Sequence, residues 1–168
     1  MAEVIDSWKP RVFIAGIMQG SLTEKALHGQ DYRERIAKII KDVLPGADIY
    51  DPLAANKNSL EYGEAAGMRT FLRHNNQCST ATDLLIAYAP EASMGTAIEM
   101  WEAWKGGAVV ITISPMTRNW VVKFLSAKIY PDLETFERGV SAGDVASWIP
   151  KESRGRKRTE EKKIDGKN

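Results

Sequence analysis

The chain has 168 residues, enough for one domain with a complete hydrophobic core. Its hydrophobic content of 43% is ordinary for a globular protein, and its net charge of +1 argues against a dedicated nucleic-acid binder. A single cysteine excludes an internal disulfide framework and a zinc site built from several cysteines. Because the sequence shows no signal-peptide pattern and no long apolar run, we expect a cytoplasmic protein without a membrane partner.

Hydrophobic periodicity divides residues 8–148 into strands that alternate with helices. In chain order, the sequence predicts a strand over 11–16, a helix over 31–44, a strand over 47–50, a polar loop over 53–63, a helix over 64–82, a strand over 83–88, a helix over 95–105, a strand over 108–113, a helix over 119–126, a short strand over 128–130, a helix over 133–140 and a final turn over 144–148. This alternation predicts an α/β fold, a single-domain Rossmann-like or flavodoxin-like parallel sheet of about five strands with helices on both faces.

Residues 149–168 form a basic tail that we expect to be disordered or loosely helical, because residues 151–158 lack apolar side chains. Residues 151–168 hold eight Lys or Arg and four Asp or Glu, a net charge of +4 that leaves −3 for residues 1–150. Two interpretations of the tail are a solvated terminus and a contact with nucleic acid or an acidic partner. Composition favours the first.

The loops after the first and third predicted strands are the expected position of a ligand. In a sheet of this type, ligands bind at the carboxyl ends of the strands, where residues 16–21 and 90–95 lie. The second loop leads into a helix with Glu99 in its early turns. Unpaired N–H groups at a helix N-terminus suit a phosphate or sugar, and the helix dipole favours an ionised Glu99. Such a carboxylate can attack an electron-poor anomeric carbon.

Three motifs together resemble the nucleoside 2-deoxyribosyltransferase superfamily. They are FIAGIMQG over 13–20, ATDLLIA over 81–87 and SMGTAIE over 93–99, and the likeness spans about residues 11–136. The branch that they resemble most releases a base from a nucleoside 5′-monophosphate.

The resemblance implies cleavage or exchange of the N-glycosidic bond of a nucleoside or nucleoside 5′-monophosphate. Glu99 is then the nucleophile that attacks C1′, and Ser93 binds the 5′ end of the substrate as phosphate or hydroxyl. Family members are usually dimers or larger, so the resemblance also implies a homo-oligomer in which Asn119 and Trp120 help to close a neighbour's pocket. The predicted catalytic residues are Glu99 and Asn75, and the predicted substrate-binding residues are Phe13, Gly16, Gln19, Gly20, Ser93, Gly95, Thr96 and Asn119.

The sequence departs from the family pattern at three of these positions. Asn75 stands where many members have an aspartate, and an amide forms hydrogen bonds but cannot act as a general acid. Phe13 stands where many have a tyrosine, and Gln19 where nucleotide hydrolases often have an arginine. Other side chains could take over the roles of the replaced aspartate and tyrosine, and the sequence does not choose among them. The candidates are Asp51, Tyr62, His74 and Asp83.

Other functions remain open. One is a nucleotide-binding or sensing domain with little catalysis, and another is a flavodoxin-like interaction domain. Cytokinin-activating phosphoribohydrolases share the pattern Gly95-Thr96-x-x-Glu99 but have paired glycines before it, which this chain lacks. Cys78 is interpreted as a buried residue, with a catalytic thiol beside His74 as the alternative. We expect no metal and no dinucleotide cofactor, because neither site pattern occurs.

Overall fold

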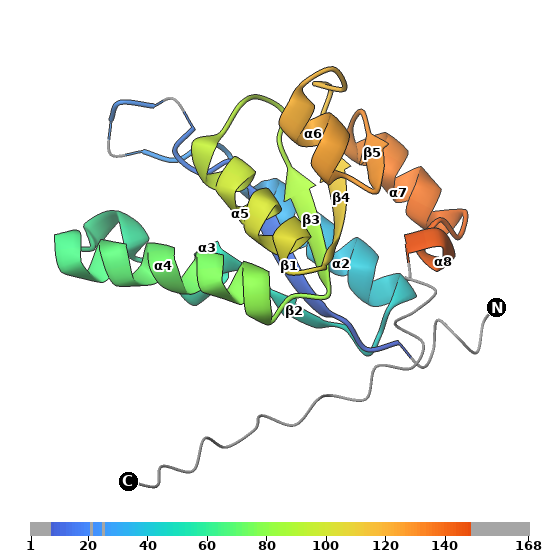
Figure 1. Ribbon diagram of the computed structural model, residues 1–168, viewed down its shortest axis with the longest axis horizontal. Helices are drawn as coiled ribbons and strands as arrows, with labels where there is room; N and C mark the ends of the chain where they lie inside the picture. Colours follow the sequence, from blue (N-terminus) through green and yellow to red (C-terminus); the bar gives the residue numbers. More distant parts are fainter. Residues whose placement is uncertain (1–7, 21, 25, 149–168) are drawn as a thin grey trace, which may run out of the picture.

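The computed structural model describes residues 8–20, 22–24 and 26–148, which form a five-stranded parallel sheet flanked by helices (Figure 1). The strands are β1 (Arg11–Gly16), β2 (Asp48–Tyr50), β3 (Leu84–Tyr88), β4 (Val109–Ile113) and β5 (Lys128–Tyr130). The helices are α2 (Asp31–Val43), α3 (Pro52–Ala55), α4 (Glu64–Thr80), α5 (Met94–Lys105), α6 (Trp120–Leu125), α7 (Leu133–Ser141) and α8 (Val145–Trp148), with a short 3-10 helix η1 (Ser59–Glu61). The predicted α/β fold with a parallel sheet is confirmed. The predicted tail, residues 149–168, lies outside the described residues.

The strand order β2-β1-β3-β4-β5 places the switch point of the sheet at β1. This strand pairs in parallel with β2 on one side and with β3 on the other. At its end Gly16 is in register with Tyr88, so β1 and β3 finish side by side. The two loops that leave these strands therefore diverge from a common point, where parallel sheets of this order bind ligands.

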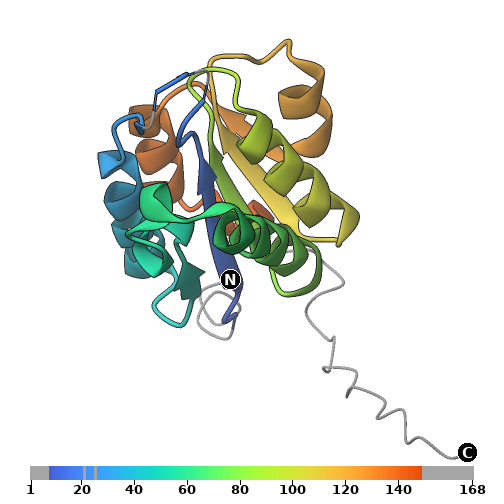
Figure 2. The same ribbon diagram turned by 90° about the vertical axis from the view of Figure 1, so that its left-hand side faces the viewer.

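Alternation along the strands gives each face of the sheet its own set of apolar side chains. On β1, Val12 and Ile14 pack with residues of α2, α7 and α8. Phe13 and Ala15 join the opposite cluster, with Cys78 of α4 and residues of α5. Helices α4, α5 and α6 thus cover one face, while α2, α7 and α8 cover the other (Figure 1 and Figure 2).

The predicted polar loop over 53–63 is wrong, because the segment contains α3 and η1. The Asp51 side chain caps α3 by accepting a hydrogen bond from the Leu53 N–H at 2.9 Å, and Pro52 occupies the first helical position. Aspartate followed by proline is a helix-start signal, which the lack of a clear apolar period had masked.

None of the helices among the described residues is long and apolar enough to cross a bilayer.

Candidate active site

A cavity of about 620 Å³ opens at the carboxyl ends of β1 and β3. Its walls come from the loop after β1, from η1, from α4 and from the N-terminal turns of α5. Eight of the ten predicted site residues line this cavity, namely Gly16, Gln19, Gly20, Asn75, Ser93, Gly95, Thr96 and Glu99. The structure therefore brings the first and third motifs together around one space.

Ser93 begins α5 and lies at the edge of the cavity. Its Oγ accepts hydrogen bonds from the Thr96 N–H at 3.4 Å and from the Thr96 hydroxyl at 3.1 Å. The side chain is therefore an N-cap, and it also lines the cavity. The first N–H groups of α5 are placed where an anion or a sugar oxygen would enter.

Glu99 lies in the second turn of α5, and it is half-buried in the wall of the cavity. Burial raises the pKa of its carboxyl to about 8, while the positive charge of Arg33 acts in the opposite direction. We expected the helix dipole to keep Glu99 ionised, and the structure corrects that expectation. The helix dipole acts mainly on groups in the first turn of a helix. Loss of solvation acts directly on the Glu99 carboxylate and therefore has the larger effect on its pKa.

Arg33 is a buried cation beneath the site, and the sequence analysis did not identify it. Only 2% of the residue is exposed. Its Nη1 donates to the Ile14 carbonyl at 2.9 Å and to Asp51 at 3.1 Å, and its Nη2 donates to the Gly16 carbonyl at 3.1 Å. Arg33 therefore fixes the end of β1 against α2 and α3. The sequence feature that indicates a buried Arg33 is its position within the apolar stripe of the helix predicted over 31–44.

Two glycines shape the loop after β1. A Cβ atom on Gly16 would lie 2.7 Å from the ring of Tyr32, whose hydroxyl donates to the Ile17 carbonyl at 3.0 Å. Gly20 has a φ of +54°, a left-handed conformation that favours glycine. The close approach of this loop to the cavity thus depends on both residues.

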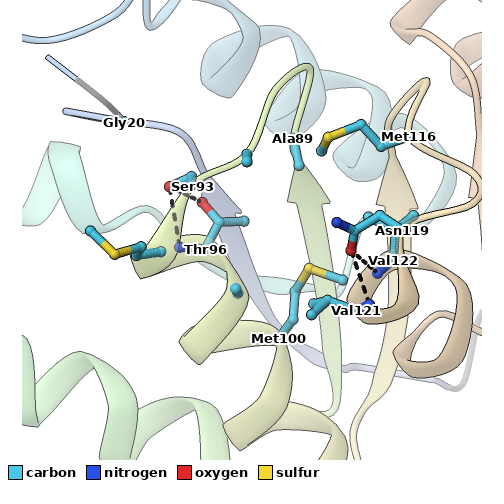
Figure 3. A pocket seen from close by; sticks show the side chains of 12 residues that line it. Gly20, Ala89, Ser93, Thr96, Met100, Met116, Asn119, Val121 and Val122 are labelled. Carbon is cyan, nitrogen blue, oxygen red and sulfur yellow. Dashed lines mark hydrogen bonds between the residues drawn. The ribbon is translucent and has the colours of Figure 1, made fainter.

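Asn119 lies apart from Glu99, in a second cavity of about 290 Å³ on the other side of the α5 N-terminus (Figure 3). It begins α6, where its Oδ1 accepts from the Val121 and Val122 N–H groups at 3.0 and 3.4 Å. The cavity is largely apolar, with Met100 and Met116 in its wall. The residues shared by the two cavities are Gly20, Ser93, Met94 and Thr96.

Phe13 is fully buried, and its contribution to the site is indirect. Its ring packs 5.5 Å from Tyr50 and edge-on, 6.4 Å between centroids, against His74. His74 and Tyr62 both line the cavity. Phe13 thus supports a cavity residue without forming part of the wall described for the cavity.

Two of the open candidates have structural roles. Asp83 directly precedes β3, at the amino end of the strand, whereas the cavity lies at the carboxyl end. Asp83 binds Arg11 with an N–O distance of 2.8 Å. Asp51 caps α3 and pairs with Arg33. Neither carboxylate lines the cavity, so neither replaces the aspartate that many family members have at the position of Asn75.

The catalytic-thiol alternative for Cys78 has no support in the structure. The residue is fully buried in the cluster with Phe13 and Leu85. Burial raises the pKa of the thiol, and the charges of Glu99 and Glu102 raise it further. A thiol held in its neutral form is a poor nucleophile. Within the described residues there is also no group of three or more His, Cys, Asp or Glu that could hold a metal ion.

The structure is similar to that of a 2-deoxyribosyltransferase from the psychrotolerant bacterium Bacillus psychrosaccharolyticus. The TM-score is 0.60 at 16% identity, over 82% of this chain and 95% of that one. Lower TM-scores relate it to a conserved protein from Enterococcus faecalis V583 (0.48, at 15% identity over 80% and 99% of the chains) and to a CMP N-glycosidase from Clostridium botulinum (0.44, at 17% identity over 79% and 98%). No protein-family model and no curated relative matches the sequence. The resemblance indicated by the motifs is therefore confirmed at the level of the fold.

Proposed function

We propose that this protein cleaves or exchanges the N-glycosidic bond of a nucleoside or nucleoside 5′-monophosphate, with Glu99 as nucleophile. One observation carries the proposal. A half-buried carboxylate lines a cavity of about 620 Å³ beside a capped helix N-terminus, at the switch point of the sheet. The shared fold with a 2-deoxyribosyltransferase supports it.

The chemistry is a double displacement at C1′. A Glu99 oxygen bonds to C1′ while the C1′–N bond breaks, and the electron pair of that bond leaves with the base. The base takes a proton from water, and a water molecule or a second base then removes the sugar from Glu99. In this arrangement the sugar lies against Gly16, Gly20 and Ser93, with its 5′ end toward the N-terminus of α5.

The test is chromatography for free base after incubation with ribonucleosides, deoxyribonucleosides and their 5′-monophosphates. Glu99→Ala should lower turnover by about a thousandfold or more while the fold is retained, because no other group takes over the covalent step. Glu102→Ala is the matched control, since Glu102 lies on the same helix but pairs with Lys105 at 2.9 Å. A Glu99→Ala rate within a factor of two of wild type would refute the nucleophile assignment.

A binding or sensing domain is the second candidate, and the raised pKa of Glu99 favours it. A carboxyl with a pKa of about 8 is mostly protonated at neutral pH and is then not a nucleophile. Tight nucleotide binding without released or exchanged base, unchanged in Glu99→Gln, would support this candidate over the enzyme.

We also propose that the protein forms a homo-oligomer through the face of α4, α5 and α6. Large apolar side chains are exposed on all three helices, including Phe71, Trp101, Trp120 and Phe124. Two pairs of these side chains contact each other, Trp101 with Trp104 and Trp120 with Phe124, and exposed apolar groups of this size are typical of interaction sites. Light scattering should give at least twice the monomer mass, and Trp120→Glu should lower it. A wild-type protein that is monomeric at tens of micromolar would contradict this proposal.

A further inference from the structure

Asn56 is a buried amide whose hydrogen bonds fix the position of His74. The residue is 5% exposed. Its Nδ2 donates to the Pro52 carbonyl at 2.9 Å and lies 3.1 Å from Nε2 of His74. Its Oδ1 accepts from Arg73 Nη2 at 2.9 Å and from the Tyr62 hydroxyl at 3.3 Å. All four positions at which an amide side chain donates or accepts are therefore occupied.

Two of these partners determine which way the amide faces. The Pro52 carbonyl can only accept a hydrogen bond, and the Arg73 guanidinium can only donate. Nδ2 therefore faces His74, and Nε2 of His74 must accept. An imidazole that accepts at Nε2 is neutral and carries its proton on Nδ1. Burial lowers the pKa of His74, and the charges of Arg73 and Arg33 lower it further, which is consistent with a neutral ring.

The Nδ1–H group of His74 is available to a bound molecule. The ring lines the same cavity as Glu99 and Asn75, and Nδ1 is not among the polar atoms buried without a partner. Within the part of the chain that the structure describes, Nδ1 has no hydrogen-bond partner. Edge contacts with Phe13 and Tyr50, at 6.4 and 5.8 Å between centroids, hold the ring in place.

The geometry points to His74 as the residue that donates a hydrogen bond from Nδ1 to an acceptor atom of the leaving base. This inference rests on the proposed function. As the C1′–N bond breaks, its electron pair moves onto the base, and the Nδ1–H group stabilises the developing negative charge. His74 keeps its proton throughout, and the base takes its proton from water. A fixed donor thereby supplies part of the assistance that the amide of Asn75 cannot give as an acid.

Two conservative variants separate this role from a structural one. In His74→Gln the longer amide can still accept from Asn56 but has no donor at the Nδ1 position. In His74→Asn the shorter amide keeps an N–H near the Nδ1 position but loses the contact with Asn56. We expect kcat for base release to fall about 10- to 100-fold in His74→Gln and to be largely retained in His74→Asn. A purely structural role predicts the reverse order, and that result would overturn the inference.

The dependence on the leaving group is a second readout. The loss in His74→Gln should shrink to less than about threefold for a base that leaves readily without assistance. The pair to compare is guanosine with 7-methylguanosine, or uridine with 5-fluorouridine, whichever the wild type accepts, as nucleoside or 5′-monophosphate. Equal losses for both members of the pair would contradict a donor to the base.

Nitrogen-15 NMR distinguishes failure of this inference from failure of the proposed function. The chain has two histidines, so His28→Gln assigns the spectrum. Wild-type His74 should show the Nδ1–H form, and free adenine or cytosine should shift that resonance even if no substrate is cleaved. If no base is released but the shift occurs, the proposed enzyme fails, while the hydrogen bond from His74 to a bound base stands. The ε tautomer, or no shift with any free base, overturns the donor role.

Discussion

The two faces of the sheet are built from alternate residues of the same strands, yet they differ in the number and size of the buried side chains packed on them. Among the described residues, sixteen buried side chains form the cluster on the side of α2, α7 and α8, against eight on the side of α4 and α5. The first cluster contains large groups such as Phe136 and Trp148. The second contains three alanines, Ala15, Ala87 and Ala103.

The face with the smaller cluster borders the proposed site. Glu99, Asn75 and His74 line the larger of the two cavities described, and they come from α4 and α5, which cover this face. Met100 belongs to the smaller cluster and also borders the cavity of about 290 Å³. One face therefore carries the larger buried cluster, while the other borders the proposed site.

The largest expected effect comes from truncating each face in turn. Phe136→Ala should lower the free energy of unfolding by about 3–5 kcal/mol, because Phe136 is fully buried in the larger cluster. Met100→Ala should cost about 2 kcal/mol, because Met100 already borders the cavity of about 290 Å³ and has fewer atoms around it to lose. Urea unfolding measures both. An equal or larger loss for Met100→Ala would contradict the difference between the faces.

The next effect is on the pH dependence of the reaction. In the proposed mechanism Glu99 attacks only when ionised, and its pKa is raised to about 8, so the active fraction should grow as the pH rises toward that value. We expect kcat/KM to increase about tenfold per pH unit below 8 and to level off above it, a hundredfold difference between pH 6 and the plateau. Initial rates of base release from pH 5.5 to 9.5 measure this. A profile that is already flat at pH 6 would show that Glu99 ionises lower or is not the nucleophile.

The smallest effect compares two glycines in the wall of the larger cavity. Gly16→Ala should destabilise the protein by about 1–2 kcal/mol, because its Cβ would overlap the ring of Tyr32. Gly95→Ala, where a Cβ meets nothing within 4 Å, should be neutral or slightly stabilising because it lies in the first turn of α5. Thermal unfolding compares them, and similar midpoints would mean that the end of β1 relaxes around an added methyl group.

Much of the architecture was predictable from the sequence, because its signals are local. The apolar run over 11–16 is β1, and the periodic stripe over 31–44 matches α2 to within a residue. The position of Glu99 beside the first loop also followed from the motif over 93–99. Each of these depends on residues close together in the chain, where period, caps and turns act.

The tertiary structure decided the features that depend on distant residues. Desolvation, not the helix dipole, dominates the pKa of Glu99. Buried Arg33 joins the end of β1 to Asp51, and Asn56 fixes the tautomer of His74 from 18 residues away. Asn119 enters a separate cavity because α6 lies on the far side of α5 from α4. Local sequence signals determine the strands, helices and loops that carry such a site. Burial, neighbouring charges and hydrogen-bond partners depend on how these elements pack, so the tertiary structure determines the electrostatics of the site.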